Sequence, residues 1–504
     1  MKKQTIIKGT LILTIGGLIS RVLGFVNRIY LSNIIGAEGM GLYQLIFPIY
    51  MICYTVCCSG IFTAISRLTA EEMAKGSKSD VKKMLRIAMV IATALGVFLM
   101  TILYFNAEFI STRIIHEPRI EVGLRIVSIS IPFTAIAHCI KGYFYGVNKP
   151  TLPAISQVVE QIIRISIIYV LSSSFISKGL AYACAVAVLG MAVGEISTCL
   201  FMYLFYYGEA KKTLITKASK TYRYFTKKVT AIAIPLTTNR LITTLLSSFE
   251  TILIPGMLKS YGYSHNYAIS VYGTLTGMAF PLIFFPTVVT TSASLMLLPA
   301  ISEAYARKQK SVIKNTVSIT IKFSIMMGIV FNFFFLAFGK DLGLIVFNEG
   351  YVGTLLISLS FLCPFLYLQT TLGSLLNGID KHMFTFRNNI IGLSIRILFI
   401  YLLIPKVGLK GYLIGLLVSL IVVSVLDIYC LVKATSLSFN PFTFIVMPAL
   451  CCIGTLAIHN ILLHTYVLPY SIKVNTLLGM AFYFIVVMPL LLITRCISIK
   501  DFKM

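Results

Sequence analysis

The stretch GTLILTIGGLISRVLGFVNRIYLSNIIGAEGMGLYQLIFPIYMICY, residues 9–54, is apolar over a length that can cross a lipid bilayer twice, because a hydrocarbon core of about 30 Å needs about 20 apolar residues. The glycine-rich segment 36–41 predicts the turn between its two arms. The first arm carries Arg21, Asn27 and Arg28. A charged side chain at this depth costs about 2.5–3.5 kcal/mol on insertion scales and therefore faces a protein interior or a water-filled cavity. Arg21 and Arg28 lie two helical turns apart on one face, so we expect this helix to form one wall of a cationic cavity.

The composition is that of a membrane protein. Of the 504 residues, 58% are hydrophobic and only 12% are charged, with a mean hydropathy of +0.90, whereas soluble domains have about 25% charged residues. Apolar runs of about 20 residues recur along the chain, and they lack the alternation of membrane barrel strands. We therefore expect an all-α polytopic membrane protein.

The net charge of +26 would indicate a nucleic-acid partner in a soluble protein. Here the basic residues gather in alternate loops, which is the positive-inside pattern of membrane proteins. Both chain ends are basic as well, and the loops between the basic ones hold few cations. This pattern predicts cytoplasmic termini, an even number of spans and no nucleic-acid partner. The basic loop residues are Arg67, Lys75, Lys78, Lys82, Lys83 and Arg86; Lys211, Lys212, Lys217, Lys220, Arg223, Lys227 and Lys228; and Arg307, Lys308, Lys310 and Lys314.

The eleven cysteines and six histidines show no metal-ligand spacing. Most of the cysteines lie within apolar runs, and we interpret them as small packing residues. The sequence also lacks a Walker-type phosphate loop. We therefore expect no metal, no cofactor and no ATP hydrolysis by this chain, which leaves the membrane potential or an ion gradient as the energy source.

The apolar pattern predicts about fourteen membrane helices joined by short loops, with both termini in the cytoplasm. We expect them at 8–35, 42–66, 85–106, 122–146, 151–173, 179–207, 228–257, 267–300, 316–338, 352–376, 388–405, 409–433, 443–463 and 473–496.

An internal repeat divides these helices. When Gly146 is set on Gly378, Arg164 falls on Arg396 and Glu195 falls on Asp427. We therefore expect two lobes of six helices, at 1–225 and 226–437, followed by two further helices at 438–504. An even number of helices gives both repeats the same orientation, so a pseudo-two-fold axis along the membrane normal is expected, with the substrate between the repeats.

Three helices besides the first carry polar residues on one face. In order along the chain these residues are Gln157, Glu160, Gln161 and Arg164; Asn239, Arg240 and Glu250; and Asn389 and Arg396. Glu160 can pair with Arg164 one turn later. Gly392 occupies the equivalent position beside Arg396, which therefore lacks a local carboxylate.

Two interpretations of these charges remain open. The pair Glu160–Arg164, together with Glu195 and Asp427, either holds helices together or serves transport, and Glu195 and Asp427 are possible ion-coupling residues. For the membrane arginines we favour a cavity, because few carboxylates compensate them and guanidinium groups bind phosphate in a bidentate manner. An anion such as a diphosphate is the natural ligand. The expected lining is Arg21, Asn27, Arg28, Gln157, Glu160, Arg164, Asn239, Arg240, Glu250 and Arg396.

The segment Gly17–Tyr43 and the following Phe47-Pro48 resemble the stage V sporulation protein B family. These proteins are polysaccharide transporters of the multidrug/oligosaccharidyl-lipid/polysaccharide flippase (MOP) superfamily. The core Ser20-Arg21-Val22-Leu23-Gly24-Phe25 also resembles the MurJ-type lipid II flippases. The resemblance spans essentially the whole chain. It implies a two-lobed transporter in the cell membrane of an endospore-forming bacterium, which exports an undecaprenyl-diphosphate-linked sugar, the lipid II of spore cortex peptidoglycan, by alternating access.

The resemblance carries few site residues over. It implies that Arg21 lies in the cavity, that Asn27 stands where the MurJ-type proteins have their next cavity arginine, and that Arg28 stands at a neighbouring aspartate position. Their second-helix arginine corresponds to about Ile52, and their eighth-helix arginine has no counterpart near Thr276. The cationic set is therefore rearranged. The resemblance also implies that the two last helices shape a groove for the polyprenyl tail.

Several alternatives remain. The transporter could move another polyprenyl-linked polysaccharide, or it could be a cation-coupled exporter of small drugs, although the latter favours an anionic cavity. A membrane-embedded glycosyltransferase or polymerase would use Glu250 or Asp427 as base, but such enzymes usually present acids on large external loops. A structural partner of cell-wall synthesis proteins would not need membrane arginines. The expected partners are the lipid-linked sugar, membrane lipids and cell-wall synthesis proteins.

Overall fold

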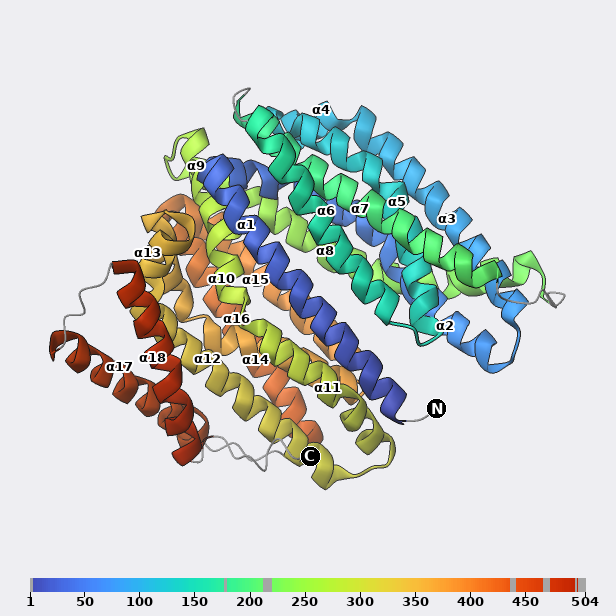
Figure 1. Ribbon diagram of the computed structural model, residues 1–504. Helices are drawn as coiled ribbons and strands as arrows, with labels where there is room; N and C mark the ends of the chain where they lie inside the picture. Colours follow the sequence, from blue (N-terminus) through green and yellow to red (C-terminus); the bar gives the residue numbers. More distant parts are fainter. Residues whose placement is uncertain are drawn as a thin grey trace. The chain divides into compact units, whose positions relative to one another are not determined.

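The computed structural model describes residues 3–175, 179–211, 220–435, 441–465, 472–494 and 496. Within these ranges the chain is helical and holds no strand, as Figure 1 shows, which confirms the all-α prediction. Several basic residues of the predicted cytoplasmic side (Lys2, Lys212, Lys217, Arg495, Lys500 and Lys503) lie outside the described residues, and the cytoplasmic placement of the termini stays a prediction.

The helical elements of the described ranges follow one another along the chain. The first half comprises α1 (Lys3–Tyr54), η1 (Thr55–Ser59), α2 (Gly60–Ala74), α3 (Lys78–Phe105), α4 (Ala107–Phe109), η2 (Ile110–Ile114), η3 (Pro118–Ile120), α5 (Glu121–Gly146), α6 (Thr151–Phe175), α7 (Leu180–Lys211) and α8 (Tyr222–Ser260). The second half comprises α9 (His265–Gly273), η5 (Thr274–Ala279), α10 (Phe280–Phe284), α11 (Thr287–Ala306), α12 (Lys310–Phe347), α13 (Gly350–Ser360), α14 (Cys363–Gly378), α15 (His382–Val407), α16 (Leu409–Thr435), η6 (Phe442–Val446), α17 (Met447–Thr465) and α18 (Ile472–Ile493).

Twelve helices of the described chain are long and apolar enough to cross a membrane, or thirteen when a bent pair is counted as one span. The first of the twelve, Ile15–Ala74, has 60 residues, and about 20 suffice for one crossing. A backbone break at Gly36 divides it, so this stretch can hold the two spans predicted at 8–35 and 42–66. The chain is a multi-pass membrane protein.

The predicted turn at 36–41 is shorter than expected. Gly36 alone leaves the helical conformation, with φ 67° and ψ −173°, and the helix resumes directly after it. Only glycine populates this backbone region readily. The glycines that follow in the segment 37–41 are helical. Gly41 allows a close approach of α9, because a Cβ there would lie 2.3 Å from the carbonyl oxygen of Ile269.

Two predicted helices prove to be broken. The helix expected at 352–376 is divided into α13 and α14, which meet at a 63° bend. The helix expected at 267–300 is divided into α9, a π-helical stretch, α10 and α11. Pro281 lies at the start of α10 and Pro286 lies between α10 and α11, and each proline removes a backbone hydrogen bond.

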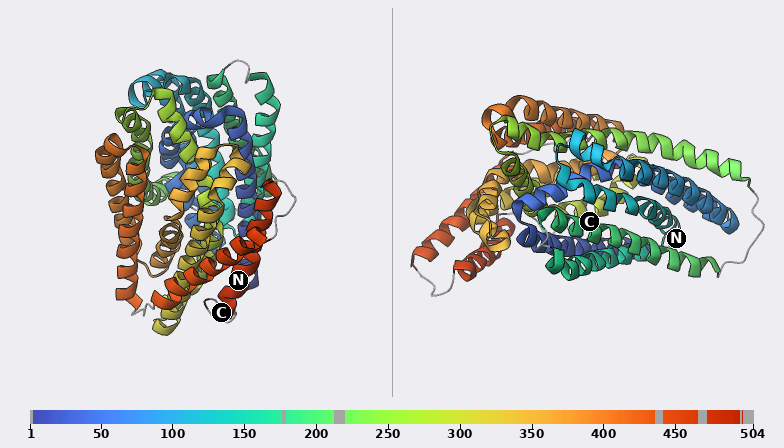
Figure 2. Two further views of the ribbon diagram at one scale, coloured as in Figure 1. Left: turned by 90° about the vertical axis from the view of Figure 1, so that its left-hand side faces the viewer. Right: turned by 90° about the horizontal axis from the view of Figure 1, so that it is seen from above.

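By their internal contacts the residues form two compact units. Unit 1 comprises Met1–Gly256 and Ser264–Gly273, and unit 2 comprises Met257–Tyr263 and Thr274–Met504. Unit 1 thus includes most of α8 and all of α9, whereas the repeat predicts a lobe boundary at residue 225. The packing of α8 explains the difference, since a Cβ on Gly60 in α2 would lie 2.2 Å from the carbonyl oxygen of Ala233. In unit 2, α17 and α18 pack against each other and against α12 (Figure 2).

Backbone geometry supports the internal duplication. In the register that sets Gly146 on Gly378, the left-handed residue Asn148 (φ 59°) falls on the left-handed residue Asp380 (φ 59°). Lys149 donates its backbone N–H to the carbonyl of Phe144, and Lys381 does the same to Leu376.

The same register relates other details of the two halves. Left-handed His116 matches left-handed Asn348. The close contact of Gly96 with Pro132 matches that of Gly328 with Pro364. Such agreement at helix ends and crossings is expected when both halves derive from one ancestral unit.

Candidate functional site

The arginine-bearing helix α1 packs along α6 in unit 1. A Cβ on Gly16 would lie 2.9 Å from the Cβ of Ala154, and one on Gly24 would lie 3.7 Å from the side-chain oxygen of Gln161. Small residues allow such close approach of membrane helices. The two polar faces that the sequence predicts separately therefore belong to one surface of unit 1.

The three polar residues of α1 differ in exposure. Arg21 is exposed, Arg28 is half-buried and Asn27 is only 4% exposed. Arg21 therefore projects from the protein surface of unit 1, while Asn27 and Arg28 lie against neighbouring helices. The structure places Arg28 near Arg164 of α6 and Tyr43 of α1.

On α6 the predicted ion pair is present. Arg164 Nη2 donates to Glu160 Oε1 at 2.6 Å, and Thr198 of α7 donates to the other carboxylate oxygen at 3.5 Å. The side chains of Arg164 and Glu160 are 15% and 12% exposed. The pair therefore joins α6 to α7, as the structural interpretation of these charges expects.

Three polar atoms of this surface have no hydrogen-bond partner among the described residues. They are Asn27 Oδ1, Gln161 Oε1 and Arg164 Nε, all of them buried. A buried polar group without a partner costs about 1–3 kcal/mol, so such groups are rare unless a ligand or water completes them. Their gathering on α1 and α6 beside Arg28 makes this surface the candidate binding site.

A second polar cluster of unit 1 surrounds Glu195 of α7. The hydroxyl of Tyr50 lies 3.3 Å from Glu195 Oε1, and Thr134 Oγ1 lies 3.4 Å from Oε2. One turn later on α5, His138 contacts the hydroxyl of Tyr54 through Nε2 at 3.0 Å. The sequence reasoning missed Tyr50, Tyr54, Thr134 and His138. The i, i+4 spacing of Thr134 and His138 was the available signal, since it places both on one face.

The residues predicted to line the site from α8 differ in how deeply they are buried. Asn239 and Arg240 are exposed, whereas Glu250 is 5% exposed. The same helix contacts the first span through Ser248, which donates to the carbonyl of Pro48 at 3.1 Å, and through Thr244, 3.1 Å from the hydroxyl of Thr55. The polar face predicted on α8 is therefore partly an interface.

Unit 2 holds the remaining predicted residues. Arg396 is half-buried on α15, and Asp427 is 2% exposed on α16. Asp427 accepts a hydrogen bond from the side chain of Asn388 at 2.7 Å. Asn389, which the sequence predicts on the polar face of this helix, is exposed. Neighbouring residues point about 100° apart around a helix, so Asn388 rather than Asn389 faces Asp427.

Other chemistry finds little support in the described residues. They contain no group of three or more His, Cys, Asp or Glu side chains that could hold a metal ion. All eleven cysteines are free and buried, which confirms their interpretation as packing residues.

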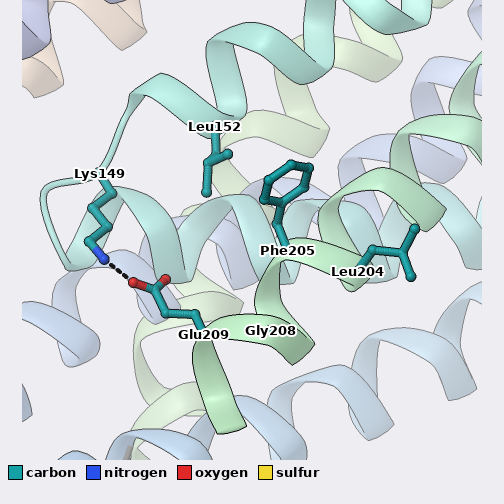
Figure 3. A pocket seen from close by; sticks show the side chains of 6 residues that line it. All are labelled: Lys149, Leu152, Leu204, Phe205, Gly208 and Glu209. Carbon is teal, nitrogen blue, oxygen red and sulfur yellow. Dashed lines mark hydrogen bonds and ion pairs between the residues drawn. The ribbon is translucent and has the colours of Figure 1, made fainter. Parts of the chain in front are cut away.

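A pocket of about 480 Å³ lies at one end of α6 and α7, and none of the predicted site residues lines it. Figure 3 shows the ion pair of Lys149 and Glu209 beside Leu152, Leu204 and Phe205. Lys149 and Glu209 are the charged residues that line the pocket, and they pair with each other.

Comparison with protein families identifies a match over residues 6–305 to the family described as "Polysaccharide biosynthesis protein". The stage V sporulation protein B of Bacillus subtilis (strain 168) is 28% identical over 450 residues, which cover 87% of this chain and 86% of that protein. The lipid II flippase MurJ of the same organism is 24% identical over 428 residues, covering 78% and 76%.

Solved structures share the fold. A lipid II flippase MurJ in an inward closed conformation matches with a TM-score of 0.73 at 16% identity, covering 98% of this chain and all of that one (100%). An inward-facing multidrug resistance MATE family transporter of the MOP superfamily matches with a TM-score of 0.62 at 15% identity, covering 83% and 94%. The activities named for these proteins are those of a flippase and of transporters, not of enzymes.

Proposed function

The chain belongs to the polysaccharide biosynthesis protein family, and from that premise we propose that it is a flippase that exports an undecaprenyl-diphosphate-linked oligosaccharide across the cell membrane. The proposed cargo is the peptidoglycan precursor lipid II, for synthesis of the spore cortex. The proposed mechanism is alternating access through a cationic cavity. The similarity to the stage V sporulation protein B and to MurJ of Bacillus subtilis supports the cargo class and an endospore-forming host.

The observation that carries the proposal is the set of incomplete polar groups on α1 and α6. Asn27 Oδ1 and Gln161 Oε1 belong to side-chain amides, and Arg164 Nε is a donor. Because each is buried without a partner among the described residues, the surface is prepared for a polar ligand. Sugar hydroxyls and phosphate oxygens supply the complementary donors and acceptors.

The charge of this surface favours an anion. Arg164 is matched by Glu160, but Arg21 is exposed and takes part in none of the ion pairs found among the described residues. A guanidinium group forms paired hydrogen bonds with phosphate oxygens. We therefore assign Arg21 and Arg28 to the diphosphate, and Asn27, Gln157 and Gln161 to the polar part of the cargo. Asn239, Arg240, Glu250 and Arg396 complete the proposed lining.

A second candidate is a cation-coupled exporter of small drugs, which the fold shared with the MATE transporter favours. The exposed arginine on α1 argues against it, because a cationic drug would be repelled. A flippase for another polyprenyl-linked polysaccharide would use the same diphosphate contacts. Cell-wall synthesis proteins are the proposed protein partners, since they consume the exported precursor.

The test measures lipid II at the outer leaflet of bacterial cells that have been depleted of their other flippases. We expect the wild-type chain to raise the outer-leaflet lipid II, and Arg21→Ala to abolish that rise while inserting normally. Arg113→Ala is the matched control, because Arg113 is exposed outside the candidate spans. If the correctly inserted wild type does not raise outer-leaflet lipid II, lipid II is not the cargo. If Arg21→Ala raises it as much as the wild type does, Arg21 does not contact the cargo during transport.

A further inference from the structure

Glu195 is a membrane carboxyl group for which the described residues provide no ion pair. It lies near the middle of the candidate span Leu180–Glu209 and is half-buried. Arg164, which acts on Glu195 electrostatically, is engaged with Glu160 at 2.6 Å. An ionised carboxylate without a partner at this depth is costly, and such a group is usually neutralised instead.

The hydrogen bonds around Thr134 point to the charge state of Glu195. A threonine hydroxyl has one proton to donate. Thr134 Oγ1 lies 3.0 Å from the backbone carbonyl oxygen of Ser130, which can only accept, and 3.4 Å from Glu195 Oε2. The shorter contact takes the proton. The contact with Glu195 is then a hydrogen bond when Oε2 itself carries a proton and donates it to Thr134.

The other oxygen, Oε1 of Glu195, accepts a hydrogen bond whether or not the carboxyl group is protonated. The hydroxyl of Tyr50, from α1, donates to Oε1 at 3.3 Å. Tyr50 is 4% exposed and Thr134 is 1% exposed, so both partners are fixed by packing. The carboxyl group therefore keeps its position while the proton on Oε2 comes and goes.

His138 does not neutralise Glu195. Its Nδ1 lies 2.9 Å from the backbone carbonyl oxygen of Thr134, so Nδ1 carries the hydrogen. Its Nε2 lies 3.0 Å from the hydroxyl of Tyr54, which donates to it. This arrangement describes a neutral ring, and the cationic Lys141, three residues later and 7% exposed, opposes a second positive charge.

The remaining charged groups near Glu195 oppose one another. Glu160 of α6 disfavours a second negative charge, whereas Arg164 of α6 and Lys141 of α5 favour one. The titratable groups facing the cluster from the other elements are Tyr50 and Tyr54 of α1, Cys58 of η1, His138 of α5 and Arg240 of α8.

We propose that Glu195 is a proton-binding site that alternates between two hydrogen-bonded states. With the proton bound, Oε2 donates to Thr134 Oγ1 and Thr134 donates to the Ser130 carbonyl. When the proton leaves to water, the Thr134 hydroxyl turns from Ser130 to the carboxylate. The proton is thereby the coupling ion of the transporter, and only that last step rests on the proposed function.

The test uses infrared difference spectra of the full-length protein in liposomes, recorded between acidic and alkaline buffers. The carbonyl stretch of a protonated carboxyl group is separate from the bands of a carboxylate. We expect the wild type to show a protonated-carboxyl component that disappears in alkaline buffer and is absent from Glu195→Gln. Glu108→Gln is the matched control and should retain it, because Glu108 is exposed outside the candidate spans and distant in sequence from the groups around Glu195.

A second variant keeps the proposal testable if Glu195→Gln does not insert. Thr134→Val removes the acceptor of the proposed O–H bond, so the protonated-carboxyl component should shift in frequency. A component that persists in Glu195→Gln, or that Thr134→Val leaves in place, would overturn the proposal. Neither spectrum requires transport, so a wild type that moves no lipid II would refute the proposed function and leave the proton site standing.

Discussion

Gly41 and Gly273 occupy equivalent positions in the two repeats, and they meet in unit 1. A Cβ on Gly273 would lie 2.4 Å from the backbone nitrogen of Gly41 and 2.0 Å from the carbonyl oxygen of Ala37. Backbone atoms cannot turn aside as a side chain can, so both positions require glycine. The close crossing of α1 and α9 therefore accounts for the glycine at position 41, which the sequence analysis attributed to a turn.

Gly273→Ala should destabilise the protein by about 1–3 kcal/mol, the usual cost of overpacking a tight interface. Thermal unfolding followed with a thiol-reactive dye measures this, because all eleven cysteines are free and buried in the folded protein. Gly256→Ala is the control, since a Cβ placed there would meet nothing within 4 Å apart from the nearby backbone of its own helix. Equal unfolding temperatures of the two variants would contradict the close crossing.

Arg164→Ala should cost about 3–5 kcal/mol, because it leaves Glu160 as an unpaired charge inside the membrane. The double variant Glu160→Gln/Arg164→Gln should recover most of the lost stability, because it leaves no unpaired charge inside the membrane. The same dye assay reports both values.

A surface pair of identical spacing provides the comparison. Glu303 and Arg307 lie 2.8 Å apart with side chains 61% and 65% exposed, so Arg307→Ala should cost only about 0.3–0.5 kcal/mol. Similar losses for the two arginine variants would show that the Glu160–Arg164 pair is solvated.

Gln161→Leu should leave the unfolding temperature unchanged or raise it, because Gln161 Oε1 makes no hydrogen bond among the described residues. Outer-leaflet lipid II should nevertheless fall, since the proposed cargo loses a polar contact. Gln309→Leu applies the same substitution outside the candidate spans and should affect neither quantity. A loss of stability without a loss of lipid II would make Gln161 a structural residue.

Glu117 should make the stability of unit 1 depend on pH. Burial alone would raise the pKa of Glu117, but hydrogen bonds from Arg119 and His265 outweigh it and lower the pKa from its ordinary value of 4.5. Arg119 also pairs with Glu38 at 2.6 Å, which ties this segment to α1. A lowered folded-state pKa stabilises the protein above the unfolded value, and that contribution is lost as the pH falls through the folded-state pKa.

The measurement is the unfolding temperature across the range below pH 4.5. The wild type should lose stability there more steeply than Glu117→Gln, which has no carboxylate to protonate. Glu108→Gln changes an exposed carboxylate of the same region and should keep the wild-type slope. Parallel curves for wild type and Glu117→Gln would contradict the role of Glu117.

Local sequence was sufficient for several features. The apolar runs predict the membrane helices, because a bilayer of fixed thickness sets their length and composition. The spacing of Glu160 and Arg164 predicts their pairing, because the helix itself brings residues four apart together. The matching of Gly146 with Gly378 predicts a duplication, which equivalent helix ends then support.

Other features depended on which helices meet. Thr134 and His138 of α5 join Tyr50, Tyr54 and Glu195 only because α5 packs against α1 and α7. Asp427 accepts its hydrogen bond from Asn388 and not from Asn389, because α15 packs with Asn388 toward α16.

Tertiary structure likewise decided that α9 belongs to unit 1 while the chain after Gly273 belongs to unit 2. The helices are alike in apolar surface, and lipid solvates them as well as protein does. Their pairing therefore rests on small residues and polar contacts between distant segments. The sequence by itself determined that the chain spans the membrane and where its charges lie along each helix; the tertiary structure alone decided which of those charges share a site.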